Sequence, residues 1–305
     1  MLRAPNLSLT KFRSRSLAVL SAVDMAAAAR LERPHHHHQH VVVMRHGDRL
    51  DNIDRLWPST TPRPWDPPLA EVGQARAFET AKGLPAQLGF PIHRVVVSPF
   101  RRCVDTALGL IAGLSAPDED PDAVTGDGGI DPSKVKVSIE YGLGELFNNI
   151  AIRHPPPCPE DHADWGFNIP EIEALIPLDA LDNTVKSVSS KLPQWGETEP
   201  KAKERYLHTI HSLADRYPSE NLLLISHGEA VKVTVSTHLE DTARFKIKMD
   251  YCGYAQLRRQ IFQNGESSVA GGFELVGELW RNRHPVLAED ADVNDTSRGT
   301  SLKFF

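Results

Sequence analysis

Cysteine is scarce in this chain of 305 residues, and the three that occur, Cys103, Cys158 and Cys252, stand far apart. No two of them have the C-x-x-C spacing of zinc sites and redox motifs, and an odd, scattered set forms no complete disulfide framework. The sequence therefore predicts reduced thiols and argues against a small disulfide-stapled or zinc-ribbon protein.

Long hydrophobic runs are also missing, because no apolar stretch approaches the roughly 20 residues that a membrane-spanning helix needs. Excess positive charge is absent too, since the formal net charge is −6. Such a balance argues against nucleic acid and against anionic membranes as partners. A content of 40% hydrophobic and 24% charged residues is that of an ordinary folded protein with room for one large α/β domain.

Acidic residues are nearly absent from the first 30 positions. Asp24 is the one acid there, beside five arginines and lysines and many Ser, Leu and Ala. Arg- and Ser-rich, acid-poor N-termini are typical of organellar transit peptides. We expect residues 1–40 to be a disordered leader outside the fold. This leader either has no targeting role, in which case a cytoplasmic protein is expected, or it directs the protein to a chloroplast or mitochondrion.

The leader ends in a histidine tract, H-H-H-H-Q-H at 35–40. A flexible polyhistidine run whose rings have no ordered hydrogen-bond partners binds metal loosely and defines no geometry. The interpretation favoured here is a native low-complexity linker that runs into the first strand, and a metal-binding function built on it is the weakest of the hypotheses.

From residue 41 onward, strand-like and helix-like segments alternate. Alternation of this kind predicts a three-layer α/β/α fold, a mostly parallel sheet with helices on both faces. One catalytic domain is expected over 41–280, with a lid-like insertion at 142–196 and a flexible tail at 281–305. The expected strands are 41–44, 93–98, 135–140 (one face exposed) and 221–226, followed by an antiparallel pair at 255–261 and 272–279. The expected helices are 69–88, 100–114, 198–217 and one that begins at 229.

Chemically active side chains follow each of the parallel strands. Arg45-His46-Gly47 comes after the first strand, S-P-F-R-R at 98–102 after the second, and Ser226-His227-Gly228 after the fourth, while Glu140 and Glu145 follow the third. In open α/β sheets, ligands bind outside the carboxyl ends of the strands. Two imidazoles, several guanidiniums and a carboxylate at one edge predict a phosphoryl-transfer site.

Four motifs in this order resemble the histidine phosphatase superfamily, which has a phosphoglycerate mutase-like fold. They are R-H-G at 45–47, L-A-E-V-G-Q-A at 69–75, S-P-x-x-R-x-x-x-T-A at 98–107 and S-H-G at 226–228, and the resemblance covers about residues 41–280. The string R-H-G-D-R-L-D looks closest to the branch that includes the ubiquitin-associated and SH3-domain-containing phosphatases.

The resemblance implies a role for each residue. His46 would attack phosphorus to give a phosphohistidine, while a backbone carbonyl fixes its tautomer. A carboxylic acid, Glu145 in preference to Glu140, would protonate the leaving oxygen, and Arg101 would be a solvated neighbour. No metal or other cofactor is expected, because guanidiniums supply the positive charge. The phosphoryl oxygens would be held by Arg45, Arg49, Arg102 and His227.

A metal-independent phosphomonoesterase is therefore the leading hypothesis. The alternatives are a non-catalytic phosphate-binding or interaction module on the same scaffold, and a phosphoglycerate mutase-type phosphotransferase. Asp48-Arg49 departs from the acid-then-serine pattern of the mutases, which favours the phosphatase. The expected partner is a phosphorylated small molecule or phosphoprotein, and a homodimer stays open. Trp57 and Trp65 either wall a flat leaving group or serve packing.

Overall fold

A mixed sheet of seven strands runs through the computed structural model, which describes residues 36–114, 135–161, 165–238, 249–264 and 267–277. The strand order is β3-β2-β4-β1-β5-β6, and β7 also pairs with β5. The first four strands in sequence are mutually parallel, so their carboxyl ends share one edge, whereas β5 runs antiparallel to β1. The strands are β1 His36–Arg45, β2 Arg94–Val97, β3 Lys136–Ile139, β4 Leu222–Ser226, β5 Tyr254–Asn264, β6 Ser267–Ala270 and β7 Glu274–Val276.

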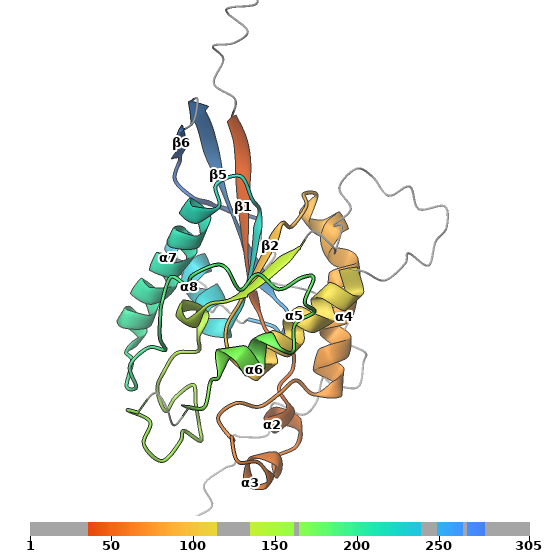
Figure 1. Cartoon of the computed structure of the whole chain (residues 1–305), viewed down its shortest axis with the longest axis vertical. Coiled ribbons are helices and arrows are strands. Elements are labelled where there is room, and N and C mark those ends of the chain that lie inside the picture. The colour runs from red at the N-terminus through yellow and green to blue at the C-terminus, as the bar shows by residue number, and fades with distance from the viewer. Residues whose placement is uncertain (1–35, 115–134, 162–164, 239–248, 265–266, 278–305) are drawn as a thin grey trace, which may run out of the picture.

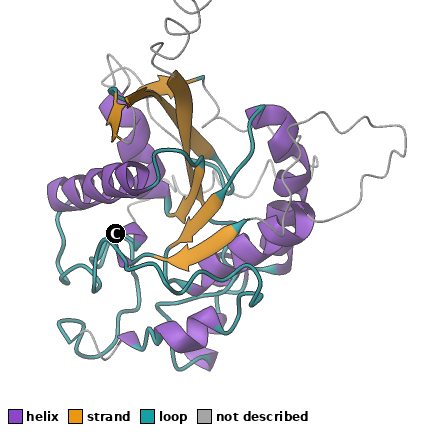
Figure 2. Ribbon diagram, turned by 45° about the horizontal axis from the view of Figure 1, so that its top comes forward, coloured by secondary structure: helices purple, strands orange, loops and turns teal. Residues whose placement is uncertain are grey.

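Helices cover both faces of this sheet (Figures 1 and 2). Val42 and Met44 of β1 belong to the core under α4 (Glu71–Leu88) and α5 (Arg101–Leu114), whereas Val41 and Val43 belong to the core under α7 (Glu199–Arg216) and α8 (Gly228–His238). Successive strand residues point to opposite faces, so a continuous valine run supplies both cores. The predicted three-layer α/β fold is confirmed. The short helices are α2 Leu50–Ile53, α3 Trp57–Thr60, α6 Ile169–Glu173 and the 3₁₀ turn Tyr141–Leu143.

The histidine tract differs from its expectation. Strand β1 begins at His36, and His36–His40 pair with 258–262 of β5, so the linker interpretation is wrong for these residues. The Gln39 side chain fixes this segment, because its Nε2 donates to three backbone carbonyls. One is that of Ala214 in the last turn of α7, and the other two, of Tyr217 and Glu220, follow the helix. Backbone pairing with β5 supplies the order that the low-complexity sequence does not indicate. Residues 1–35 lie outside the described part.

The 142–196 segment also differs from the expected lid. Trp165 is fully buried, with its ring centroid 4.2 Å from that of Phe147 and 5.5 Å from that of Trp195. The same segment covers β3, where Val137 bonds to the backbone of Ala180 and Asp182, so β3 is buried on both faces and lacks the exposed face that was expected. These described residues therefore build part of the core.

No helix in the described ranges is both long and apolar enough to cross a membrane. The expected acidic loop at 115–134 and the tail at 281–305 fall outside those ranges.

Candidate active site

His46 lies directly after β1, buried at the edge where the parallel strands end. Its backbone N–H donates to Ser226 O at 3.0 Å, which ties it to the end of β4. Its Nδ1 lies 2.7 Å from Gly47 O. A carbonyl oxygen only accepts, so Nδ1 carries the proton and Nε2 keeps its lone pair. The ring is therefore fixed in the tautomer that leaves the Nε2 lone pair free.

Close backbone packing holds this loop in place. A Cβ at Gly47 would lie 2.7 Å from Gly73 O, and one at Gly73 would lie 2.4 Å from Asp48 O. Only glycine allows such an approach between the loop and the first turn of α4. Thr106 adds a second tie, because its hydroxyl accepts from Gly47 N at 3.0 Å and donates to Arg102 O at 2.7 Å. These contacts give physical reasons for the glycine of L-A-E-V-G-Q-A and the threonine of the S-P motif.

Arg102, from the first turn of α5, connects the site. Its Nε donates to His46 Nε2 at 3.2 Å, and its Nη2 lies 3.1 Å from Glu145 Oε2 and 3.2 Å from His227 Nδ1. The side chain is 1% exposed, yet Nη1 has no hydrogen-bond partner among the described residues. A buried donor without an acceptor costs about 1–3 kcal/mol, so this nitrogen marks a position for an acceptor atom.

His227 and Glu145 complete the centre. Glu145 Oε2 lies 3.1 Å from His227 Nδ1, and Ser98 Oγ lies 2.9 Å from His227 Nε2. Since a carboxylate only accepts, the proton resides on Nδ1 and the Ser98 hydroxyl donates to Nε2. Burial lowers the pKa of His227 to about 4, although the Glu145 carboxylate opposes this. His227 is therefore a neutral donor whose N–H faces the site.

Charge and burial set the other two ionisation states. Burial, reinforced by the Arg102 guanidinium, lowers the pKa of His46 well below its usual value, which keeps the ring neutral. Burial alone would raise the pKa of Glu145, but His227 and Arg102 outweigh it and hold that pKa well below its usual range. The site thus combines a neutral imidazole with an ionised carboxylate.

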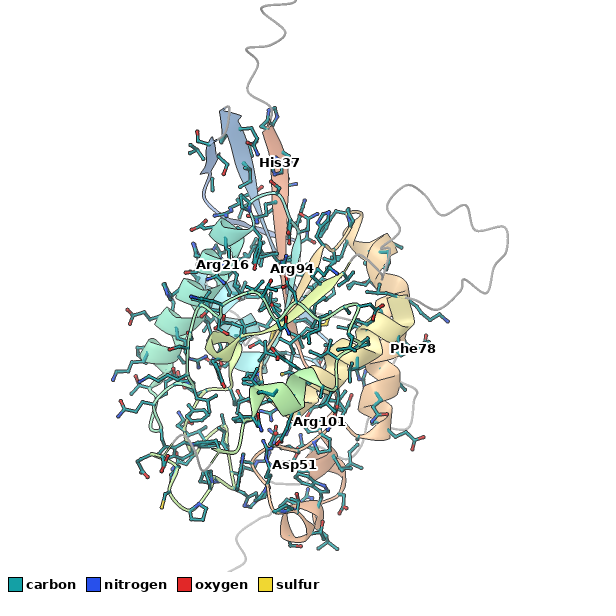
Figure 3. The ribbon with its side chains drawn as sticks, in the orientation of Figure 1. His37, Asp51, Phe78, Arg94, Arg101 and Arg216 are labelled. Carbon is teal, nitrogen blue, oxygen red and sulfur yellow. The ribbon has the colours of Figure 1, made fainter. Side chains whose placement is uncertain are left out.

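Arg45 and Arg49 lie beside this centre. Arg45 Nη1 donates to Met249 O, its Cζ lies 4.0 Å above the Tyr251 ring, and its buried Nε has no partner within the described ranges. Arg49 is paired with Asp51 through two of its nitrogens, Nε at 2.9 Å and Nη2 at 2.7 Å. Figure 3 shows Asp51 at this end of the sheet. Arg45 is thus poised to donate to a ligand, whereas Arg49 is neutralised at the rim.

Three other residues from the sequence have structural roles. Arg101 is half-exposed and pairs with Asp105 at 2.6 Å, as expected of a solvated neighbour. The Glu140 carboxylate accepts from three backbone N–H groups. Trp65 packs against Trp165 and donates to its carbonyl at 3.1 Å, which favours packing over a leaving-group wall.

Sequence reasoning missed three contributors. Ser98 stands in the S-P motif, but nothing in the motif indicates its contact with His227. Tyr251, whose ring centroid lies 5.9 Å from that of His46, has no motif at all. Arg205 of α7 donates to the carbonyls of Gly142, Gly144 and Glu145 and pairs with Glu197, so it holds the loop that carries the acid.

A metal ion is a poor occupant for this centre. Among the described residues, His46, Glu145 and His227 offer ligand atoms within 4.8 Å of one another. The guanidinium of Arg102 already contacts all three and would repel a cation. Unpartnered N–H groups on Arg102 and Arg45 suit an oxyanion instead, held against His46 Nε2.

Comparisons with known proteins point to one family. A sequence model described as histidine phosphatase superfamily (branch 1) matches residues 41–122 and 165–268. No curated protein is similar enough in sequence to count as a match.

Solved structures similar to this chain include phosphatases and a mutase. The ecdysone phosphate phosphatase of Bombyx mori, solved with tungstate, is 19% identical, with a TM-score of 0.50 over 77% of this chain and 92% of that one. A phosphoglycerate mutase from Bacillus anthracis is 17% identical (TM-score 0.43, 72% and 88% covered). A mycobacterial glucosyl-3-phosphoglycerate phosphatase is 18% identical (TM-score 0.43, 78% and 98% covered).

Proposed function

Because this chain belongs to the histidine phosphatase superfamily, we propose that it is a phosphomonoesterase that acts through a phosphohistidine on His46. One observation carries the proposal: a neutral imidazole, with Nδ1 fixed on Gly47 O, presents Nε2 to a buried guanidinium that has a donor to spare. A nucleophile beside preorganised positive charge is what phosphoryl transfer requires.

In the first step, a phosphate dianion enters and becomes the acceptor for Arg102 Nη1, Arg45 Nε and His227 Nδ1. The Arg102 Nε–H turns from His46 Nε2 to a phosphate oxygen, which frees the nitrogen lone pair. Nε2 then bonds to phosphorus while the ester P–O bond breaks and the leaving oxygen takes a proton. The fixed donors oppose the charge that develops on the equatorial oxygens.

Substrate entry also supplies the acid. Arg102 and His227 lower the pKa of Glu145 in this structure. A bound phosphate dianion would accept hydrogen bonds from the same N–H groups in place of Glu145. Loss of these partners and the nearby negative charge both raise that pKa, so Glu145 binds a proton when substrate is present. It gives this proton to the leaving group and then, as a carboxylate, activates the water that hydrolyses the phosphohistidine.

Arg49 favours hydrolysis over the mutase alternative. Arg49 stands where the mutase pattern has a serine after the acid, and its side chain pairs with Asp51. Both residues belong to the string R-H-G-D-R-L-D, which motivates the proposed kinship with the ubiquitin-associated and SH3-domain-containing phosphatases. The proposed substrate is a phosphorylated small molecule or phosphoprotein. No metal is required in this scheme, since the guanidiniums supply the charge.

The test is turnover of a panel of phosphomonoesters by purified protein with a chelator present. Acid-labile phosphate is expected on wild type and on His208→Ala, an exposed histidine of α7, but not on His46→Ala, whose turnover should fall at least ~10³-fold. Turnover that needed added metal, or survived His46→Ala, would refute the mechanism.

The same assay separates the alternatives. A phosphotransferase would move phosphate to an added acceptor faster than to water. A binding module would take up inorganic phosphate without labelling His46.

A further inference from the structure

The histidine segment of β1 lies at the other end of the sheet from the active site, and the proposed function makes no use of it. Figure 3 shows His37 at this far end of the strand, away from Asp51. The strand here is paired with β5 on one side only, because β4 begins opposite Val41. Four histidines therefore lie on an ordered backbone that reaches the surface.

Strand alternation sorts these histidines into two faces. His37 Nε2 lies 3.1 Å from Pro218 O, on the same face as Gln39, whose amide contacts the end of α7. His40 is on the other face, where its ring stacks on Phe90 with centroids 3.9 Å apart. Because side chains repeat every two residues along a strand, His36 and His38 share the face of His40.

We propose that His38 and His40, with His36 beside them, form a surface site for a divalent transition metal ion such as Zn²⁺, Ni²⁺ or Cu²⁺. The ring centroids of His38 and His40 are 6.4 Å apart. A metal about 2.1 Å from a ring nitrogen lies about 3.2 Å from that ring's centre, so one ion can just bridge the pair. His38 is exposed and free to rotate inward, toward a tetrahedral angle.

His40 has a hydrogen-bonding side chain on the ring nitrogen that faces the protein, as metal-bound histidines usually do. The Gln256 Nε2 atom lies 3.1 Å from His40 Nδ1, and the nitrogen and oxygen of a side-chain amide can exchange places by a flip. With the amide oxygen turned toward the ring, it accepts the Nδ1 proton and leaves Nε2 to bind metal. Stacking on Phe90 holds the ring orientation, so less side-chain entropy is lost on binding.

The charges around the site are mixed. Arg258 lies opposite His40 on β5 and opposes a bound cation, but its guanidinium is paired with Glu274 at 2.7 Å. Imidazole ligands suit Zn²⁺, Cu²⁺ and Ni²⁺, whereas Mg²⁺ and Ca²⁺ prefer oxygen. The site is therefore expected to select transition metals and to bind more tightly when Arg258 is replaced by Gln.

The experiment is titration of the full chain with Zn²⁺ and with Ni²⁺ in chelator-free buffer, followed by isothermal calorimetry. His38→Ala is expected to weaken binding at least tenfold, whereas His37→Ala, on the opposite face, should change it less than twofold. Gln256→Ala should weaken binding roughly tenfold. Circular dichroism of each variant checks that the fold is kept, and the nitrogen hyperfine pattern of bound Cu²⁺ should report two or three imidazoles.

An equal loss of metal affinity in His37→Ala and His38→Ala would show that the histidines bind metal as a flexible tract, without strand geometry. That result would overturn the proposed site. No loss in either variant would place the metal elsewhere, with the same consequence. Neither result depends on phosphatase activity. The metal site can therefore be refuted while the proposed function holds, and the reverse is also true.

Discussion

Two glutamates five positions apart show how a side chain's surroundings decide its role. Glu145 contacts His227 and Arg102 in the centre, while the Glu140 carboxylate accepts from the backbone N–H groups of Gly142, Val188 and Ser189 at 2.8, 2.5 and 3.0 Å. Both are buried acids near the end of β3, and the sequence alone left both open. Hydrogen-bond partners separate them, one as a candidate acid and one as an anchor.

Replacing each glutamate with glutamine should therefore affect different quantities. Glu145→Gln removes the proton donor, and kcat of the folded enzyme should fall ~10²–10⁴-fold. Glu140→Gln leaves a backbone donor without its charged acceptor, so the free energy of unfolding should fall by about 1–3 kcal/mol while kcat of the folded enzyme stays near wild type. Steady-state kinetics and urea unfolding measure the two effects, and the opposite pattern would reassign the acid.

At the level of elements, contact between the nucleophile loop and α4 depends on two facing glycines. Gly73→Ala would push its methyl group into the Asp48 backbone, which cannot rotate away, so we expect the free energy of unfolding to fall by ~2 kcal/mol or more and kcat to fall with it. Gly83→Ala on the same helix meets only the flexible Gln87 side chain at 3.1 Å.

Gly83→Ala is thus the matched control, and it should stabilise the protein by about 0.5–1 kcal/mol through helix propensity. Chemical denaturation compares the two variants. Stabilisation by both would show that the loop does not need close contact with α4.

The loop that carries Glu145 depends on a buried ion pair from α7. Arg205→Lys keeps the charge but loses the five-donor fork that binds Glu197 and three loop carbonyls. We expect kcat to fall about tenfold with KM nearly unchanged, because the acid is mispositioned while the phosphate donors stay.

Arg216→Lys, on the last turn of the same helix, is the control that should leave kcat unchanged. A KM effect without a kcat effect would show that Arg205 acts on substrate binding instead.

The parts of the site that the sequence predicted are those that follow strands directly. His46, Arg102 and His227 each stand within the first residues after a buried strand, and the shared edge of a parallel sheet brings them together. Arg205 and Tyr251 could not be found in this way, since the loop carbonyls that Arg205 binds and the His46 ring near Tyr251 lie 60 or more positions away, and no local pattern records such pairings. The strand at His36–His40 was missed for the same reason, because its order comes from β5.

For the molecule as a whole, burying neutral imidazoles makes stability depend on pH. His227 has a pKa of about 4 in the folded state against an ordinary 6.5, and that of His46 is lowered as well. Between pH 6.5 and about 4, the unfolded chain binds protons that the folded site refuses, so stability falls as pH falls.

Each such imidazole should remove up to about 1.4 kcal/mol per pH unit in this window. Urea unfolding at pH 7.5, 6.5 and 5.5 tests this. His227→Asn should reduce the slope of the free energy of unfolding against pH by the amount that one proton contributes. A free energy of unfolding that stayed constant from pH 7.5 to 5.5 would mean that the histidines are not buried in the neutral form.

Strand β1 has a consequence for how the enzyme loses activity. It is hydrogen-bonded to β4 on one side and to β5 on the other over Val41–Met44, so the backbone before His46 should exchange its amide hydrogens only when the whole domain opens. The Glu145 loop is tied down by side chains instead and belongs to a less protected unit. Partial opening would then displace the proposed acid while His46 stays in place, so turnover should be lost before the domain unfolds, an inactivation that proceeds in two stages.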